Sequence, residues 1–139
     1  MLKIGGYINI LIGIGHLVGL IWPEQMFEKT GALEGMKTLA QIHFSLPYLL
    51  TVFVALIFLI FGLYGLSAGE KIKKLPFLKF GIYAIASIYL FRGIAEQLYN
   101  ISQQTTTISE TIQSIIAVII GLLFLIGGLK KWKFKNRIK

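Results

Sequence analysis

Four long apolar stretches constrain the fold of this 139-residue chain more than any other feature of its sequence. A bilayer core about 30 Å thick requires roughly 20 mainly apolar residues for one α-helix to cross it. The stretches at 4–22, 45–66, 77–99 and 111–129 each meet that requirement. Only 14% of the residues are charged, which is too few to cover a soluble domain of this size. We therefore predict a single-domain, all-α integral membrane protein with four transmembrane spans.

The composition excludes several other classes of protein. Intrinsic disorder requires low hydrophobicity, whereas 55% of these residues are hydrophobic. The chain has no cysteine, so a disulfide scaffold, a thiolate metal site and a cysteine nucleophile are all excluded. Zinc lacks a third convincing ligand, and we do not expect a bis-histidine haem because the two histidines are offset in depth. The sequence identifies no cofactor and no catalytic residue.

Local signals mark the ends of the predicted spans. Pro47 and Pro76 fit the starts of the second and third spans, where a missing N–H costs little. Just before the fourth span, Thr107 and Glu110 have the spacing of a capping box, which satisfies backbone N–H groups at a helix start.

The first connection, 23–44, is longer than the others and contains apolar residues at helical spacing. The residues with this spacing are Leu33, Met36, Ala40 and His43. We therefore expect a helical outer segment between the first and second spans. It either lies along the membrane interface or extends the second span outward, bending near Pro47.

The distribution of lysine and arginine predicts the orientation of the spans. Eleven of these residues flank the spans on one side: Lys3, Lys71, Lys73, Lys74, Lys79, Lys130, Lys131, Lys133, Lys135, Arg137 and Lys139. The other side has only Lys29 and Lys37. Because cytoplasmic loops carry the excess of positive charge, both termini are predicted to be cytoplasmic. The same bias explains the net charge of +8, so we expect the basic tail 130–139 to attract anionic lipid and no nucleic acid to be bound.

Small residues recur every three or four positions along each span, where they allow close helix packing in lipid. The connections after the second and third spans are short, which favours neighbouring helices of opposite direction. We therefore predict an antiparallel four-helix bundle. These faces also permit a homodimer.

Three ionisable residues lie inside the predicted spans: His16, Arg92 and Glu96. A charged side chain at the bilayer centre costs about 2.5 to 3.5 kcal/mol, so its presence requires a reason. All three lie toward the outer side, which also holds His43 and Gln113. We predict that these five residues line an outward binding site. In it, Arg92 would hold an anionic or carbonyl group, while Glu96 and His16 would exchange protons.

A structural interpretation of the same residues stays open. Arginine can extend to the outer headgroups, a glutamate near a helix end can already lie at the interface, and a histidine can join helices by hydrogen bonds. Arg92 and Glu96 are four residues apart and can pair on one helix face.

The first span contains the glycine-rich run Gly13–His16, and the third contains a polar residue in Leu90–Gly93. With the length of the chain and its four spans, these features resemble the DoxX-like group of small bacterial membrane proteins. The resemblance implies an association with membrane redox or sulfur-handling complexes, and it transfers no catalytic residue. The isoleucine- and lysine-rich composition also indicates a bacterial chain.

We therefore expect a multi-pass protein of the bacterial inner membrane that is not an enzyme. It would act as an accessory subunit of a larger membrane complex or as a small-ligand-binding protein. The alternative is a membrane enzyme or carrier that acts on a quinone, a lipid or another small amphipathic ligand in the outer half of the bundle.

Overall fold

A computed structural model of the protein describes residues 1–105 and 107–135. This part of the chain forms six α-helices and contains no strand. In chain order the helices are α1 (Leu2–Gly19), α2 (Pro23–Thr30), α3 (Leu33–Ile42), α4 (Leu46–Ala68), α5 (Leu78–Ser102) and α6 (Ile108–Lys135). Residues 136–139 of the predicted basic tail lie outside the described residues.

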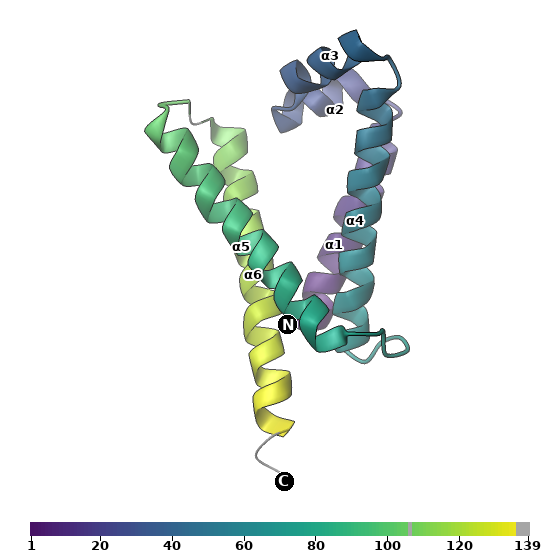
Figure 1. The fold of residues 1–139 in the computed structure, drawn as a ribbon, viewed down its shortest axis with the longest axis vertical. Helices are drawn as coiled ribbons and strands as arrows, with labels where there is room; N and C mark the ends of the chain where they lie inside the picture. The colour runs from purple at the N-terminus through teal and green to yellow at the C-terminus, as the bar shows by residue number, and fades with distance from the viewer. Residues whose placement is uncertain (106, 136–139) are drawn as a thin grey trace.

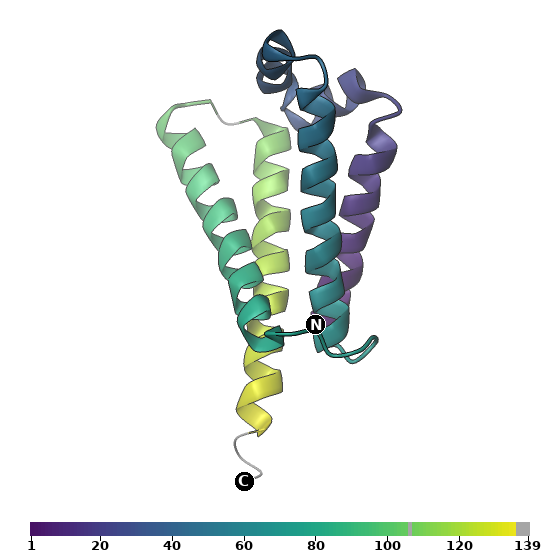
Figure 2. The ribbon, with the colours of Figure 1, turned by 45° about the vertical axis from the view of Figure 1, so that its right-hand side comes forward.

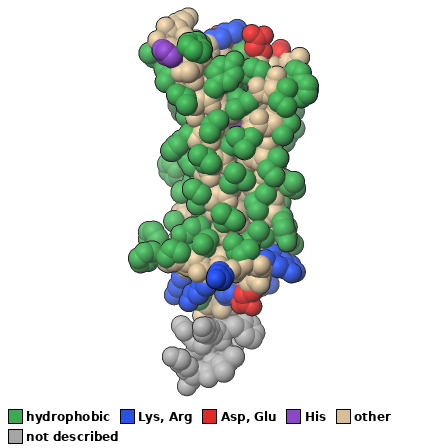
Figure 3. All heavy atoms as spheres, turned by 90° about the vertical axis from the view of Figure 1, so that its right-hand side faces the viewer, with side chains coloured by type: hydrophobic (Ala, Val, Ile, Leu, Met, Phe, Trp, Pro, Cys, Tyr) green, Lys and Arg blue, Asp and Glu red, His purple; other side chains and the backbone are tan. Residues whose placement is uncertain are grey.

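Four of these helices, α1, α4, α5 and α6, are long and apolar enough to cross a membrane. Large hydrophobic side chains cover the middle of the molecule, while lysines gather at one end (Figure 3). An exposed apolar surface this extensive is found where acyl chains replace water as the solvent. The prediction of an all-helical, multi-pass membrane protein is therefore confirmed.

The ends of the long helices differ from the predicted spans by a few residues. α1 ends at Gly19 rather than Trp22, because the N–H groups of residues 20–22 turn back to carbonyls three residues earlier, just before Pro23. α6 is the longest, since it begins directly after the Thr107 cap and continues to Lys135. The capping box is confirmed: Thr107 N–H donates to Glu110 Oε2 at 3.0 Å, and Glu110 N–H donates to Thr107 Oγ1 at 3.2 Å.

The predicted outer segment contains two helices rather than one. α3 is the helix that the apolar spacing predicts, whereas α2 was not predicted; it ends at Thr30 and is followed by Gly31 in the left-handed conformation, with φ 75°. α3 does not extend the second span, because His43 is extended and breaks the helix before α4 begins. Pro47 lies in the first turn of α4, where its missing N–H removes no hydrogen bond of the helix.

The spanning helices form two tightly packed pairs, α1 with α4 and α5 with α6. In the first pair the backbones touch at glycines: a Cβ atom on Gly65 would lie 2.6 Å from Cα of Gly6. In the second pair Gly93 lies against the backbone of Ser114, and Gly121 lies against Leu90. Small residues thus set the distance within each pair, as expected where hydrophobic burial does not drive helix association.

Figure 1 shows the two pairs close together at one end of the molecule and farther apart at the other, and Figure 2 shows the four long helices running in roughly the same direction. We call the first end the basic end, since it holds the N-terminus and the lysines at positions 3, 71, 73, 74 and 79, and the second end the far end, which α2 and α3 cover. The buried apolar cluster between the pairs includes Leu2 of α1, Ile82 of α5 and Phe124 of α6. Its members nearest the far end are Tyr89 and Ala117. We call the part of the protein between this cluster and the far end the far half.

Candidate functional site

A buried hydrogen bond joins the two helix pairs near the middle of the protein. The hydroxyl of Tyr89 on α5 donates to Oδ1 of Asn9 on α1 at 2.5 Å. Asn9 is 0% exposed and Tyr89 is 5% exposed. Asn9 Nδ2 donates in turn to the carbonyl of Gly5 at 2.8 Å. Both polar side chains are therefore partnered, as a site away from water requires.

Aromatic rings surround this hydrogen bond. Phe61 of α4 packs edge-on against Tyr89, with ring centroids 6.1 Å apart. Phe58, one turn along α4, lies 6.5 Å from Tyr89 and 5.1 Å from the ring of His16. The three helices α1, α4 and α5 thus meet in one aromatic layer, and His16 lies at its edge.

Two polar residues of the far half follow the hydrogen-bonded pair Asn9–Tyr89 at the same sequence separation. Leu2 of α1 lies against Gly127 of α6, and Ile82 of α5 lies against Gly128, so α1 and α5 begin at the same end. His16 follows Asn9 by seven residues, and Glu96 follows Tyr89 by seven residues. Seven residues are about two turns, or about 10 Å, and return to the same helix face. His16 and Glu96 therefore each follow the central hydrogen bond by about two turns, on the corresponding face of their own helix.

The half-buried His16 has one ring nitrogen committed within its own helix. Its Nδ1 lies 2.8 Å from the carbonyl oxygen of Ile12. A carbonyl oxygen only accepts, so Nδ1 carries a proton. In the neutral ring, Nε2 is then the nitrogen that accepts a hydrogen bond or a proton.

The predicted pairing of Arg92 with Glu96 is confirmed. Arg92 Nε lies 3.3 Å from Glu96 Oε2, four residues along the same helix. The two side chains are 50% and 38% exposed. This pair lies within α5, and in the described residues no hydrogen bond or ion pair joins it to another helix. The half-exposed Arg92 guanidinium places a positive charge in the far half of the protein.

Gln113 and His43 occupy separate places. Gln113 Nε2 donates to the carbonyl of Thr30 at 3.0 Å, which ties the end of α2 to the start of α6, and Ser109 Oγ donates to the carbonyl of Lys29 beside it. His43 is exposed between α3 and α4, where its Nδ1 lies 2.7 Å from Ser45 Oγ and its ring stacks on Phe44. In the described part of the chain, no hydrogen bond, ion pair or ring contact joins either of these two residues to His16 or to the Arg92–Glu96 pair.

Asn9 and Tyr89 were not predicted as site residues from the sequence. The available signal was Asn9 itself, an amide in the middle of an apolar span. The interior also holds Gln97 of α5 and Ser114 of α6, whose Oε1 and Oγ atoms are buried without a hydrogen-bond partner in the described part of the chain. Within that same part, no group of three or more His, Cys, Asp or Glu side chains could hold a metal ion.

Comparison with known proteins adds no relative: no family model, no curated protein and no solved structure matches this chain.

Proposed function

We propose that this chain is a multi-pass protein of the bacterial inner membrane that binds a small amphipathic ligand between its two helix pairs, in the far half. The four spans form one antiparallel bundle with both termini in the cytoplasm, so that the far end faces outward. The protein acts without catalysis, as a ligand-binding protein or as an accessory subunit of a larger membrane complex. The positive-inside bias supports the orientation.

This proposal rests on the place where the buried apolar packing between the two helix pairs ends. Toward the far end, the fully buried cluster reaches no farther than Ala117 and Tyr89, which is hydrogen-bonded to Asn9, and the partly buried Ile12 and Phe58 pack against it. Three ionisable groups follow on the corresponding helix faces: His16, Arg92 and Glu96. Ionisable residues at membrane depth commonly mark the place where a polar part of a ligand binds.

The chemistry of these groups favours a ligand with an oxygen-bearing head and an apolar body. The Arg92 guanidinium donates hydrogen bonds to a carbonyl, carboxylate or phosphate oxygen. His16 Nε2 accepts from a hydroxyl group, and Phe58 and Phe61 offer apolar contact beneath the head. A quinone or a lipid has this pattern of groups.

A carrier or enzyme acting on such a ligand is the second candidate, and one observation favours it. His16 Nδ1 is held by Ile12, which directs Nε2 to accept a proton, and Glu96 follows Tyr89 by the same seven residues that separate His16 from Asn9. These two groups could exchange protons with a quinol. The resemblance to DoxX-like proteins supports a membrane redox partner.

The test compares purified wild-type protein with R92L, E96L and the R92L/E96L double variant. Bound lipids and quinones are extracted and identified by mass spectrometry, and the melting temperature in detergent is measured with and without a short-chain quinone. We expect the wild type to retain an amphipathic compound and the double variant to fold without it.

Gln113→Ala serves as the control, because Gln113 bonds to Thr30 away from the Arg92–Glu96 pair. That variant should retain the compound. Equal retention by the wild type and the folded double variant would show that Arg92 and Glu96 bind no ligand.

A further inference from the structure

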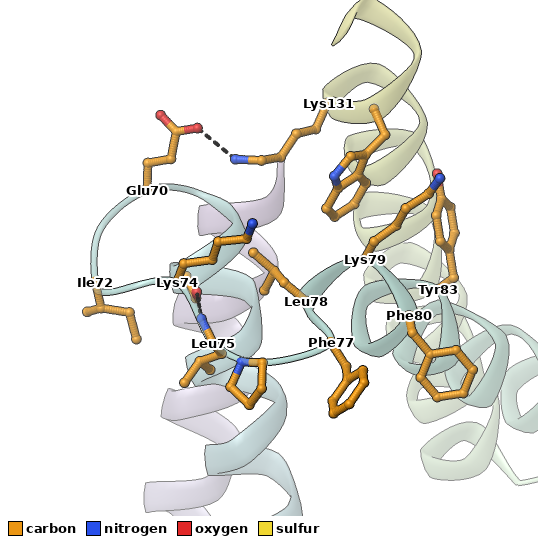
Figure 4. A pocket seen from close by; sticks show the side chains of 13 residues that line it. Glu70, Ile72, Lys74, Leu75, Phe77, Leu78, Lys79, Phe80, Tyr83 and Lys131 are labelled. Carbon is orange, nitrogen blue, oxygen red and sulfur yellow. Dashed lines mark hydrogen bonds and ion pairs between the residues drawn. The ribbon is translucent and has the colours of Figure 1, made fainter. Parts of the chain in front are cut away.

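An open pocket of about 1510 Å³ lies at the basic end, at the opposite end of the protein from the proposed ligand site (Figure 4). It is formed by the connection between α4 and α5, the first turns of α5 and the C-terminal part of α6. Ser67 builds the connection: its Oγ donates to the carbonyl of Lys73 and accepts from the N–H of Leu75, both at 2.9 Å. The pocket is therefore shaped by a hydrogen-bonded turn.

The polar side of the pocket is cationic. Three lysines line it, Lys74, Lys79 and Lys131, against one carboxylate, that of Glu70. Lys131 Nζ is held at 2.7 Å by both the carbonyl of Ala68 and Glu70 Oε1. Lys131 thus fastens α6 to the end of α4, and Lys74 and Lys79 bring the charge of the lining to a net positive value.

The opposite side of the pocket is aromatic. Phe77 and Phe80 project away from the Lys131–Glu70 pair (Figure 4) and are 84% and 76% exposed. Phe77 is placed there by a left-handed backbone, with φ 50°, immediately before α5. Tyr83 and Trp132 pack together with ring centroids 5.8 Å apart. Lysines above aromatic residues are the pattern of a membrane protein at the boundary between headgroups and acyl chains.

We propose that this pocket is a binding site for an anionic phospholipid. Its phosphate is held by the ammonium groups of Lys74 and Lys79, and its acyl chains lie along Phe77 and Phe80. Charge complementarity selects the headgroup, because a net-positive lining attracts a phosphate diester with an uncompensated negative charge and gains less from a zwitterion. The exposed phenylalanines select a lipid over a free phosphate, since only a lipid covers them.

Tryptophan fluorescence tests this site directly. The chain has two tryptophans, and W22F leaves Trp132 in the pocket as the only one. The W22F protein is reconstituted in vesicles that contain either phosphatidylglycerol or phosphatidylcholine brominated on the acyl chain near the headgroup, at equal mole fraction. The brominated anionic lipid should quench Trp132 more strongly. Each lysine should contribute about a fivefold enrichment of anionic lipid.

The decisive variant is K74A/K79A, and K71A/K73A is its matched control. Both remove two lysines from the same segment, but Lys71 and Lys73 do not line the pocket. We expect both brominated lipids to quench Trp132 of K74A/K79A equally, and the anionic lipid to remain the stronger quencher in the control. K74Q/K79Q replaces the first variant if circular dichroism shows that it does not fold.

Three results would overturn the proposal. A preference that survives in folded K74A/K79A would show that these lysines do not hold the headgroup. An equal loss in K71A/K73A would show a diffuse attraction to the basic end. Relief of quenching by millimolar glycerol 1-phosphate would show that the pocket binds a soluble phosphate rather than a lipid.

Discussion

The Tyr89 hydroxyl on α5 donates a hydrogen bond to Asn9 on α1, across the boundary between the two helix pairs. Most other close contacts of these helices are made within their own pairs, α1 with α4 and α5 with α6. The hydrogen bond therefore fixes one pair against the other, near the level where buried apolar packing between them ends.

Tyr89→Phe should lower the free energy of unfolding by about 1 kcal/mol. It leaves Asn9 Oδ1 buried without its donor, a change that costs about 1–3 kcal/mol in soluble proteins, while hydrogen bonds between membrane helices average about 0.6 kcal/mol. Unfolding by sodium dodecyl sulfate in mixed micelles measures the change. Tyr99→Phe is the control, because Tyr99 is 65% exposed on the same helix.

A double-mutant cycle with Asn9→Leu extends this test. If the bond joins the two pairs, the double variant N9L/Y89F should be more stable than the sum of the two single losses predicts. Strict additivity would indicate that each residue acts through packing alone.

Gly65→Ala should destabilise the protein by about 1–3 kcal/mol, because the added methyl group overpacks the α1–α4 contact. Its Cβ would lie 2.6 Å from Cα of Gly6 and 3.0 Å from the carbonyl oxygen of Leu2. Both are backbone atoms, so neither can rotate away. The same unfolding experiment in mixed micelles measures the loss.

Gly15→Ala is the matched control for Gly65→Ala. Gly15 also lies inside a spanning helix, but a Cβ atom there meets nothing within 4 Å. Alanine at this position should therefore be neutral or stabilise by about 0.5–1 kcal/mol, because it favours the helix. Similar losses of stability in both variants would mean that the close approach of α1 and α4 does not restrict position 65 to glycine.

R92L/E96L should change the free energy of unfolding by less than about 0.5 kcal/mol, since a partly exposed pair four residues apart contributes little. The pair lies within α5, and nothing in the part of the chain that the structure describes bonds it to a second helix. Thermal melting in detergent, followed by circular dichroism, checks this. A loss above about 1.5 kcal/mol would instead show that the two side chains connect helices and would support the structural interpretation.

Much of the fold could be predicted because the physical signals are local. Apolar length predicts the four spanning helices, and the spacing of Thr107 and Glu110 predicts the cap of α6. Helix α2 was missed because Pro23–Thr30 is short and polar, and its apolar face is limited to Phe27 and Met26. A helix of this length shows too few turns for a periodic pattern to emerge.

The site was predictable only in part, for a physical reason. Arg92 and Glu96 pair within one helix, so their spacing in the sequence is sufficient to predict the pair. The Asn9–Tyr89 bond joins residues 80 positions apart and depends on how the two helix pairs rotate against each other. Sequence periodicity places each residue on a face but does not show which faces meet.

The predicted orientation can be tested by cysteine labelling, because the natural chain has no cysteine. Thr105→Cys places a thiol in the exposed connection between α5 and α6 at the far end, and Lys71→Cys places one at the exposed basic end. If the lysine-rich side faces the cytoplasm, as we propose, a membrane-impermeant maleimide should label T105C in intact cells and K71C only after lysis. Labelling of both denatured proteins controls for thiol reactivity. The reverse pattern in intact cells would place the termini outside and turn the His16 and Arg92 side of the protein toward the cytoplasm.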